Sequence, residues 1–469
     1  MVVLSQWLWL TVGWLTWTVP GLDASLCDSG SQCNCNLGKL TCDCSTSFLK
    51  EVVLKKTSLD PTLSSISIAN CLHVHVQPNA LSHLPSLQQV SVANVKQVTL
   101  EENAFSWTTS TPQQHHTGLV INITNCNINR VPSYSFKGFL RDILLKSLNI
   151  SHINSYAFSS IDRAERIEFR NVNILEISTQ SFKQISVEFL SLLDTTLNIL
   201  PERTMTEVTV RQEVRLESLN ISRLESSALK INSPRNFRLT NSRIGYVESN
   251  AFEVGTKGDV SIHENVFSHL ESLALAGFHV EENYLEEAGK QDFVFENNTL
   301  IEFENECLKL NTSGFDPRLD WIMLKQKCSC DSAILWVNTL VVYPNMRLPI
   351  DKLLYCLNPT ATRLSDFRRL YCNVARFSVF AVVVGVVVVV GIVSVILLVV
   401  YCGIRKRGKK YINVPTNNSA LRAPEDNKRH MLVVPDGKTY RETELHVIFE
   451  HAEAIKTTNF VKGPDEPNG

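Results

Sequence analysis

The sequence repeats one pattern of apolar residues, most often every 22 to 24 residues. Counted from Ile167, positions 0, 2, 7, 10 and 15 are apolar in 48 of 50 cases, where the 44 % hydrophobic composition would give about 22. His73 and Gln97 are the two exceptions. The ten copies begin at Ile66, Val90, Ile121, Ile143, Ile167, Leu190, Val214, Phe237, Val260 and Phe293. This spacing fits neither a helix nor an ordinary strand, so we expect stacked units that share one continuous core.

One further position, position 14, supports this repeat. Position 14 is small in nearly every copy, and position 15 is bulky. The small residues are Ala80, Ala104, Ser135, Ala157, Ser181, Thr204, Ala228, Ala251 and Ala274. Positions 0 and 2 are predicted to point inward from a short strand, with positions 7, 10 and 15 completing the core. Longer gaps of 31 and 33 residues predict insertions near 106–116 and 277–290.

From about residue 27 to 373, this pattern resembles the leucine-rich-repeat family. The resemblance implies an α/β solenoid, a horseshoe of about ten repeats. The asparagine that the family usually carries at position 5 is present only at Asn265 and Asn298. Asparagine often sits one place earlier, at Asn70, Asn94, Asn125, Asn171 and Asn241. This departure leaves the geometry of the turn open, but not the stacking.

Cysteines cluster where a solenoid must cover its open ends. Before the repeats stand Cys27, Cys33, Cys35 and Cys42, and after them Cys328, Cys330, Cys356 and Cys372. Both groups look like the cysteine caps of extracellular leucine-rich repeats, a resemblance that implies Cys328–Cys356 and Cys330–Cys372 pairing. Zinc binding is the alternative, which a secretory location disfavours.

The four remaining cysteines before the apolar span lie outside these two groups. Cys71, Cys126 and Cys307 occupy inward repeat positions and are interpreted as small buried residues. Cys44 is unassigned, and a bond from it to Cys71 stays open.

Two apolar segments predict the route through a membrane. Residues 3–17 form an apolar run with four tryptophans that resembles a secretory signal peptide, although it lacks a basic flank. Residues 377–401 contain no charged residue and are long enough to cross a bilayer. The basic run that follows, from Arg405 to Lys410, predicts a cytoplasmic C-terminal side. We therefore expect a single-pass plasma-membrane protein of type I with an extracellular N-terminus.

The expected organisation follows from these boundaries. It comprises a signal peptide (1–24), an N-terminal cysteine cap (25–60), repeats (61–309), a C-terminal cap (310–375), a transmembrane helix (376–402) and a cytoplasmic tail (403–469). Five sequons predict N-glycosylation, at Asn122, Asn149, Asn220, Asn297 and Asn311.

The outward positions of the predicted inner strands are candidates for ligand contact. Their charged residues are Lys146, Arg166, Glu168, Arg170, Glu213, Arg215, Glu217 and Arg238, with the neutral Phe189, Ser191 and Leu193 between them. The mixed signs favour a protein partner over nucleic acid. The alternative is that exposed strands simply carry charges. A glycan at Asn122 would obstruct the first repeats, so contacts are expected at the repeats that begin at Ile143 to Phe237.

Nothing in the sequence predicts catalysis, a metal site or a cofactor. His115 and His116 lie in an insertion, and no nucleophile–base arrangement stands out. The tail is predicted to be mostly disordered and non-enzymatic. It offers two possible adaptor sites: Tyr411 with Asn413, and a helical stripe of Leu445, Ile448 and Phe449.

These features predict a cell-surface recognition protein, an adhesion molecule or receptor subunit, that binds an extracellular protein. The alternative is a structural surface protein that anchors matrix or organises other membrane proteins without signalling inward. The 67-residue tail lacks the length of the signalling domain of Toll-type receptors.

Overall fold

The computed structural model describes residues 26–27, 33–46, 50–108, 118–340 and 349–408. The chain divides into two units, Met1–Val384 and Gly385–Gly469. The first holds the repeats and both caps. The expected signal peptide, the pair His115 and His116, and the tail residues Tyr411, Asn413, Leu445, Ile448 and Phe449 lie outside the described residues.

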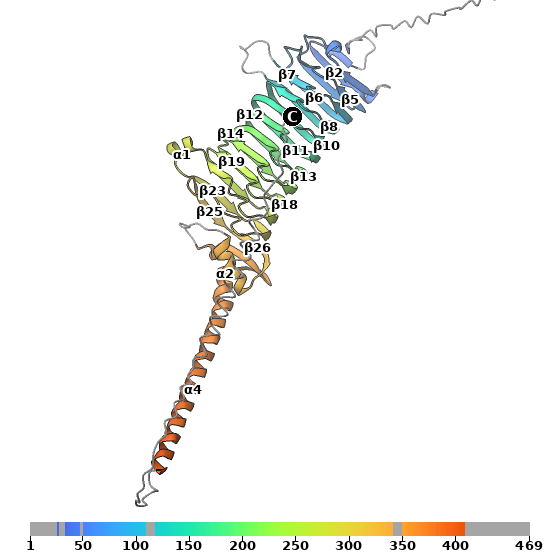
Figure 1. Cartoon of the computed structure of the whole chain (residues 1–469). Helices are drawn as coiled ribbons and strands as arrows, with labels where there is room; N and C mark the ends of the chain where they lie inside the picture. Colours follow the sequence, from blue (N-terminus) through green and yellow to red (C-terminus); the bar gives the residue numbers. More distant parts are fainter. Residues whose placement is uncertain (1–25, 28–32, 47–49, 109–117, 341–348, 409–469) are drawn as a thin grey trace, which may run out of the picture. The chain divides into compact units, whose positions relative to one another are not determined.

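The repeats form a solenoid in which three parallel ladders run from turn to turn (Figure 1). Ladder A contains positions 0 to 3 of each repeat. Its strands are β2 (Lys39–Asp43), β4 (Ser65–Ala69), β6 (Gln89–Leu100), β8 (Leu119–Val131), β10 (Leu140–Ile153), β11 (Phe158–Ile177), β12 (Phe182–Leu193), β14 (Met205–Glu217), β17 (Asn236–Thr240), β20 (Asp259–His263), β23 (Gln291–Glu296) and β25 (Phe315–Asp320).

Ladder B follows in each turn and contains positions 6 to 10. The long strands β6, β8, β10 and β11 continue into it. Its other strands are β3 (Glu51–Leu54), β5 (His73–Val76), β13 (Thr196–Leu200), β15 (Asn220–Leu224), β18 (Arg243–Val247), β21 (Val266–Leu270), β24 (Thr299–Phe303), β26 (Ile322–Lys327) and β27 (Leu354–Asn358).

Ladder C closes the turn behind position 15. The starts of β11, β12 and β14 belong to it, together with β7 (Phe105–Trp107), β9 (Phe136–Gly138), β16 (Leu229–Asn232), β19 (Phe252–Thr256) and β22 (Phe278–Val280). The solenoid predicted from the repeat is therefore confirmed. Its described turns consist mostly of strands. The helical exceptions are η1 (Cys44–Thr46) and η2 (Lys56–Ser58) near the first end, and α1 (Glu282–Ala288), which lies in the second expected insertion.

The inward residues of all turns merge into one core, as the repeat pattern predicted. Position 15 supplies a row of stacked rings: Phe105, Phe136, Phe158 and Phe182 follow one another at centroid distances of 5.2, 4.6 and 4.7 Å. Each ring fills the space between the turns on either side of it, because no turn has a second layer of its own to pack against.

The register of positions 7 and 8 needs a correction in the first two repeats. His73 and Gln97 pair with each other in ladder B and face solvent, whereas the next residues, Val74 and Val98, are fully buried. These two turns carry one extra residue before ladder B, which a fixed spacing counted from Ile167 misses.

The corner between ladders A and B explains the displaced asparagines. Position 4 adopts a left-handed backbone in every turn of ladders A and B from Asn70 to Trp321, with φ between 47° and 60°. Asparagine tolerates this conformation better than most residues with a side chain. A second left-handed corner occurs at position 13, from Asn79 to Glu306. The preference for asparagine at position 4 is thus a backbone requirement.

Position 5 lies inside the same corner and is buried in every turn. It is apolar or a cysteine in the first turns, whereas Ser242, Asn265 and Asn298 in later turns are polar and bond to backbone. Asn298 Oδ1 accepts from Asn265 N at 3.0 Å, Asn265 Oδ1 accepts from Ser242 N at 2.9 Å, and Ser242 Oγ accepts from Leu219 N at 3.0 Å. The two asparagines at position 5 therefore belong to a short hydrogen-bonded ladder.

Disulfides close both ends of the solenoid. At the first end, strand β1 (Cys33–Asn36) pairs antiparallel with β2, and the bonds are Cys27–Cys35, Cys33–Cys42 and Cys44–Cys71. At the other end the bonds are Cys328–Cys356 and Cys330–Cys372, the pairing that the family resemblance implied. Cys71 is buried as expected but is not a free thiol. The third bond fastens the N-terminal cap to the turn that begins at Ile66.

Short elements complete the second cap. Strand β28 (Thr360–Arg363) pairs antiparallel with β27, and the helical segments of this cap are α2 (Cys330–Thr339), η3 (Ile350–Lys352), α3 (Leu364–Phe367) and η4 (Arg368–Cys372). Helix α4 (Asn373–Gly408) follows. Its segment Ala381–Lys406 is long and apolar enough to cross a bilayer, with a mean hydropathy of 3.4.

We expect Asn171→Val to lower the free energy of unfolding by about 1–2 kcal/mol, because a β-branched residue is strained at a φ of 54°. Asn171→Gly is the matched control, since it loses the same 3.2 Å bond from Nδ2 to Ser147 Oγ but relaxes the backbone. Denaturant midpoints of the full chain in detergent would measure both. Equal losses for the two variants would contradict the backbone argument.

Burial raises the pKa of the Cys307 thiol to about 12, from an ordinary 9.0. The native thiol therefore keeps its proton between these values while the unfolded thiol loses it, so rising pH in this window favours unfolding. We expect Cys307 to resist iodoacetamide at pH 8 in the folded chain and to react in denaturant. Mass spectrometry of the alkylated peptide would measure this, and rapid native labelling would contradict it.

Candidate protein-binding face

The solvent side of ladder A carries all eight charged residues that were predicted from the sequence as candidates for ligand contact. Alternation along each strand directs positions 0 and 2 to the core and positions −1, 1 and 3 to solvent. Parallel pairing then aligns equal positions of successive turns in rows. One row contains Asp142, Arg166, Phe189 and Glu213.

The other two rows are equally regular. The second contains Glu168, Ser191, Arg215 and Arg238, and the third contains Lys146, Arg170, Leu193 and Glu217. The face that the sequence predicted is therefore one continuous surface over β10, β11, β12, β14 and β17.

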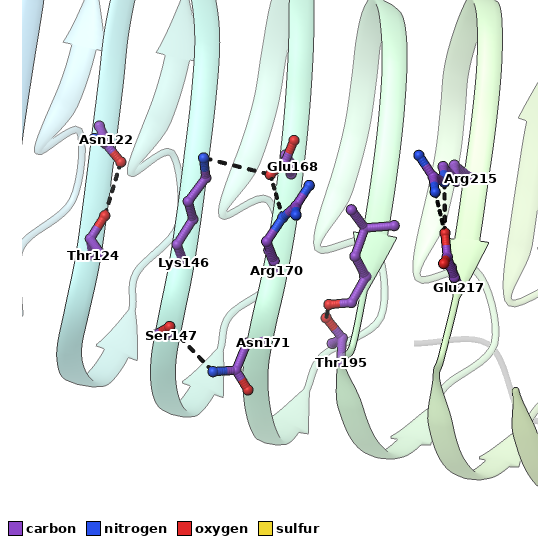
Figure 2. A network of polar contacts seen from close by, with 11 residues as sticks. Asn122, Thr124, Lys146, Ser147, Glu168, Arg170, Asn171, Thr195, Arg215 and Glu217 are labelled. Atoms are coloured by element: carbon purple, nitrogen blue, oxygen red, sulfur yellow. Dashed lines mark hydrogen bonds and ion pairs between the residues drawn. The ribbon is translucent and has the colours of Figure 1, made fainter. Parts of the chain in front are cut away.

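Most of these charges pair with one another across or along the strands. Glu168 is only 7 % exposed and lies between two cations: its Oε1 is 3.7 Å from Lys146 Nζ and 3.0 Å from Arg170 Nε (Figure 2). In the next turns Arg215 Nε donates to Glu217 Oε2 at 2.8 Å, and Arg238 Nε lies 3.2 Å from Glu213 Oε1. Seven of the eight side chains thus meet an opposite charge within the face.

Arg166 is the exception. It is exposed, and no described side chain forms an ion pair or a hydrogen bond with its guanidinium. On one side its neighbour in the row is Asp142, which forms an ion pair with Arg141, and on the other side it is Phe189, which exposes 37 % of its surface. Leu193 of the same strand is only 6 % exposed. An unpaired guanidinium and an exposed ring therefore lie side by side in a surface whose other charges are internally neutralised.

Sequence reasoning missed this distinction because each ion pair joins residues either two apart on one strand or about 23 apart in the chain. The aromatic character of Phe189 was visible in the sequence, but its exposure depends on the side chains of the neighbouring turns.

The sequons are unevenly distributed over the ladders. Asn122 lies on ladder A, two residues before Thr124, and its Oδ1 accepts from Thr124 Oγ1 at 3.1 Å (Figure 2). Asn149 and Asn220 lie on ladder B. A depression on this ladder is lined in part by His152, Leu175 and Ile199. From β10 onward, positions −1 to 3 of the described turns, which form the solvent side of ladder A, carry no sequon.

The described residues include no group of three or more His, Cys, Asp or Glu placed to hold a metal ion. The face carries charged side chains and the exposed ring of Phe189, held at the fixed spacing of the strands. Residues of these kinds are common in protein interfaces.

Comparison with known proteins adds little to this description. No family model and no curated protein matches the chain. Among solved structures, it is similar to the crystal structure of the LRIM1/APL1C complex, at 13 % identity and a TM-score of 0.25 over 85 % of this chain and 73 % of that one. The glycosylated Toll–Spätzle complex of Drosophila matches at 14 % identity and a TM-score of 0.23, over 66 % of this chain and 47 % of that one. The fold assignment therefore rests on the three ladders themselves.

We expect Glu168→Ala to lower the free energy of unfolding by about 1 kcal/mol, because Lys146 and Arg170 lose their shared acceptor and repel each other. High salt should shrink this loss, since it screens the repulsion. Denaturant midpoints at low and high salt would measure both effects. Glu176→Ala, which removes an exposed carboxylate from ladder B, is the control with a smaller expected loss. A loss unaffected by salt would contradict this account.

Proposed function

We propose that this chain is a single-pass cell-surface protein that binds an extracellular protein through ladder A, as an adhesion molecule or a receptor subunit. The pair Arg166 and Phe189 is the observation that carries the proposal. Interface hot spots are enriched in arginine and aromatic residues. The surrounding charges already form ion pairs with one another, so they add specificity without competing with Arg166 for a charge on the partner. The partner would offer a carboxylate to Arg166 and an apolar side chain to Phe189.

The direction of insertion supports an extracellular ladder A. Five disulfides lie before helix α4, and disulfides persist outside the cytosol. Arg405 and Lys406 begin a basic run at the other end of the apolar segment. By the positive-inside rule that end faces the cytoplasm. The tail that follows would signal only through adaptor proteins that bind it, at Tyr411 or at the apolar stripe around Ile448 and Phe449.

The placement of the sequons also supports ladder A as the binding surface. Glycans at Asn149 and Asn220 would cover ladder B, and a glycan at Asn122 would cover the first turns of ladder A. The ladder A surface from Lys146 to Arg238 would remain accessible. No catalytic role is proposed for the chain.

The second candidate function is a structural surface protein that anchors matrix or organises other membrane proteins without signalling inward. The internal neutralisation of ladder A favours it, because a surface with few available charges can also serve passive packing. Deletion of residues 411–469 separates the two functions, since an anchor should keep working and a receptor should not.

We expect Arg166→Ala and Phe189→Ala each to weaken binding about tenfold, the loss of one hot-spot contact. The probe is the full chain in fluorescent lipid nanodiscs, titrated onto intact cells of several types and onto cells that display the chain itself. Arg243→Ala is the matched control, because Arg243 is also exposed and unpaired among the described side chains but lies on ladder B.

A second variant tests the surface without removing either contact. Ser191→Asn combined with Leu193→Thr creates a sequon in the centre of ladder A, and its glycan should abolish binding. Protease resistance of the variant would establish that it folds. Equal affinity for this variant and the wild type would contradict the proposed surface, and failure of the wild-type probe to bind any cell would favour the structural function.

A further inference from the structure

Trp321 occupies a position where every other turn places a different kind of residue. It stands at position 4 of the last turn, where the earlier turns carry asparagine, serine, aspartate or glutamate. Its φ is 47°, in the left-handed region that bulky residues rarely adopt. The side chain is nevertheless 47 % exposed, so the strain is not offset by burial in the core. An exposed indole held in this way points to a binding role.

The indole is one layer of a fixed aromatic platform. Its ring stacks on Tyr355 at a centroid distance of 4.3 Å and an angle of 26°. The guanidinium of Arg363 lies 5.5 Å from the Tyr355 ring, and its Nη2 donates to Tyr355 Oη at 2.9 Å. Tyr355 belongs to β27, which follows Trp321 along the solenoid. It therefore covers one face of the indole from the side of the C-terminal cap, and the preceding turn lies on the opposite side of Trp321.

The residue at the same corner of that preceding turn is Asn297. Its backbone N–H donates to the carbonyl of Asp320 at 3.2 Å, which fixes Asn297 directly beside Trp321 at the spacing of adjacent strands, about 4.8 Å. Asn297 is exposed and has a φ of 55°. With Asn298 and Thr299 it forms one of the five sequons.

The amide of Asn297 differs from those of the other asparagines at this corner. Asn94, Asn125, Asn171 and Asn241 each donate Nδ2 to the position 4 side chain of the turn before. At Asn297 that neighbour is Glu264, and no bond from Asn297 Nδ2 to any described residue is formed. The nitrogen that a glycan would occupy is thus left available beside an open aromatic face.

We propose that Asn297 carries an N-linked glycan whose first sugar packs on the open face of Trp321. In this modification Nδ2 attacks the anomeric carbon of a lipid-pyrophosphate-linked oligosaccharide. The N–C bond forms, the C–O bond to the pyrophosphate breaks, and the amide loses one proton. The inference rests on the extracellular location given under the proposed function. The apolar C–H face of a pyranose sugar matches an indole ring, and packing there would restrain the glycan beside the C-terminal cap.

Three of the other sequons lack this arrangement. In ladder A, Asn122 has Ser91 and Leu144 as its neighbours in the row. In ladder B, Asn149 donates its Nδ2 to Asn127 Oδ1 at 3.0 Å, and the neighbours of Asn220 are Thr196 and Arg243. None of these three asparagines has an aromatic residue at its position in an adjacent turn.

The test uses the full chain, made in secretory-competent animal cells and purified in detergent. Glycopeptide mass spectrometry measures occupancy at each sequon, and the rate at which peptide N-glycosidase releases the glycan from the folded chain measures its restraint. We expect Asn297 to be occupied and to release its glycan more slowly than Asn311. Trp321→Asn should raise the rate at Asn297 about tenfold and leave the rate at Asn311 unchanged.

Trp321→Asn is the matched variant because asparagine is the residue that other turns carry in this left-handed corner, so the ring is lost without new backbone strain. Trp321→Phe retains a ring and should restore most of the protection. An unoccupied Asn297 beside occupied sequons elsewhere, or a release rate unaffected by Trp321→Asn, would overturn the proposal. Absence of glycans from every sequon would instead contradict the extracellular location on which it rests.

Discussion

The structure depends on burial between turns. Each turn is a single layer of backbone, so its inward residues have no partner within the turn and are covered only by the turns before and after. The stack from Phe105 to Phe182 shows this directly, since each inner ring contacts one ring on either side. The arrangement is continuous, which explains why both ends need a cap and why disulfides are placed there. Cys44–Cys71 joins the first cap to the first turns, and Cys330–Cys372 holds α2 beside η4.

Sharp corners make this stacking possible, and they set the second constraint on the sequence. The chain must leave one ladder and enter the next within about two residues, and it does so through left-handed backbone at positions 4 and 13. Asn125 and Asn171 meet that requirement at low cost and use their side chains to bond the turn before. Trp321 adopts the same left-handed backbone with more conformational strain, and residues held under such strain are often found at functional sites.

The repeat, the caps and the general location of the binding face could be predicted from sequence because they depend on local spacing. The apolar period located the core, and the cysteine clusters located the ends. Position 8 in the first turns could not be predicted this way, because one extra residue shifts the burial from His73 to Val74 without altering the composition. Which charges of the candidate face form ion pairs could not be predicted either, because a pair such as Arg238 with Glu213 depends on the register between strands.

The sequence by itself determined that this chain is a stack of units, mostly of 22 to 24 residues, closed by cysteine caps. Apolar residues that recur with this period can be buried only if successive units pack against one another. It also determined which residues point outward from ladder A, since alternation along a strand is a local property. Only the tertiary structure decided which of those residues are available. Stacking brings residues of successive turns to the spacing of adjacent strands. There Glu168 forms ion pairs with Lys146 and Arg170, whereas Arg166 and Phe189 remain exposed to solvent. Local sequence carries no record of those neighbours, because they arise only when the turns are stacked in register.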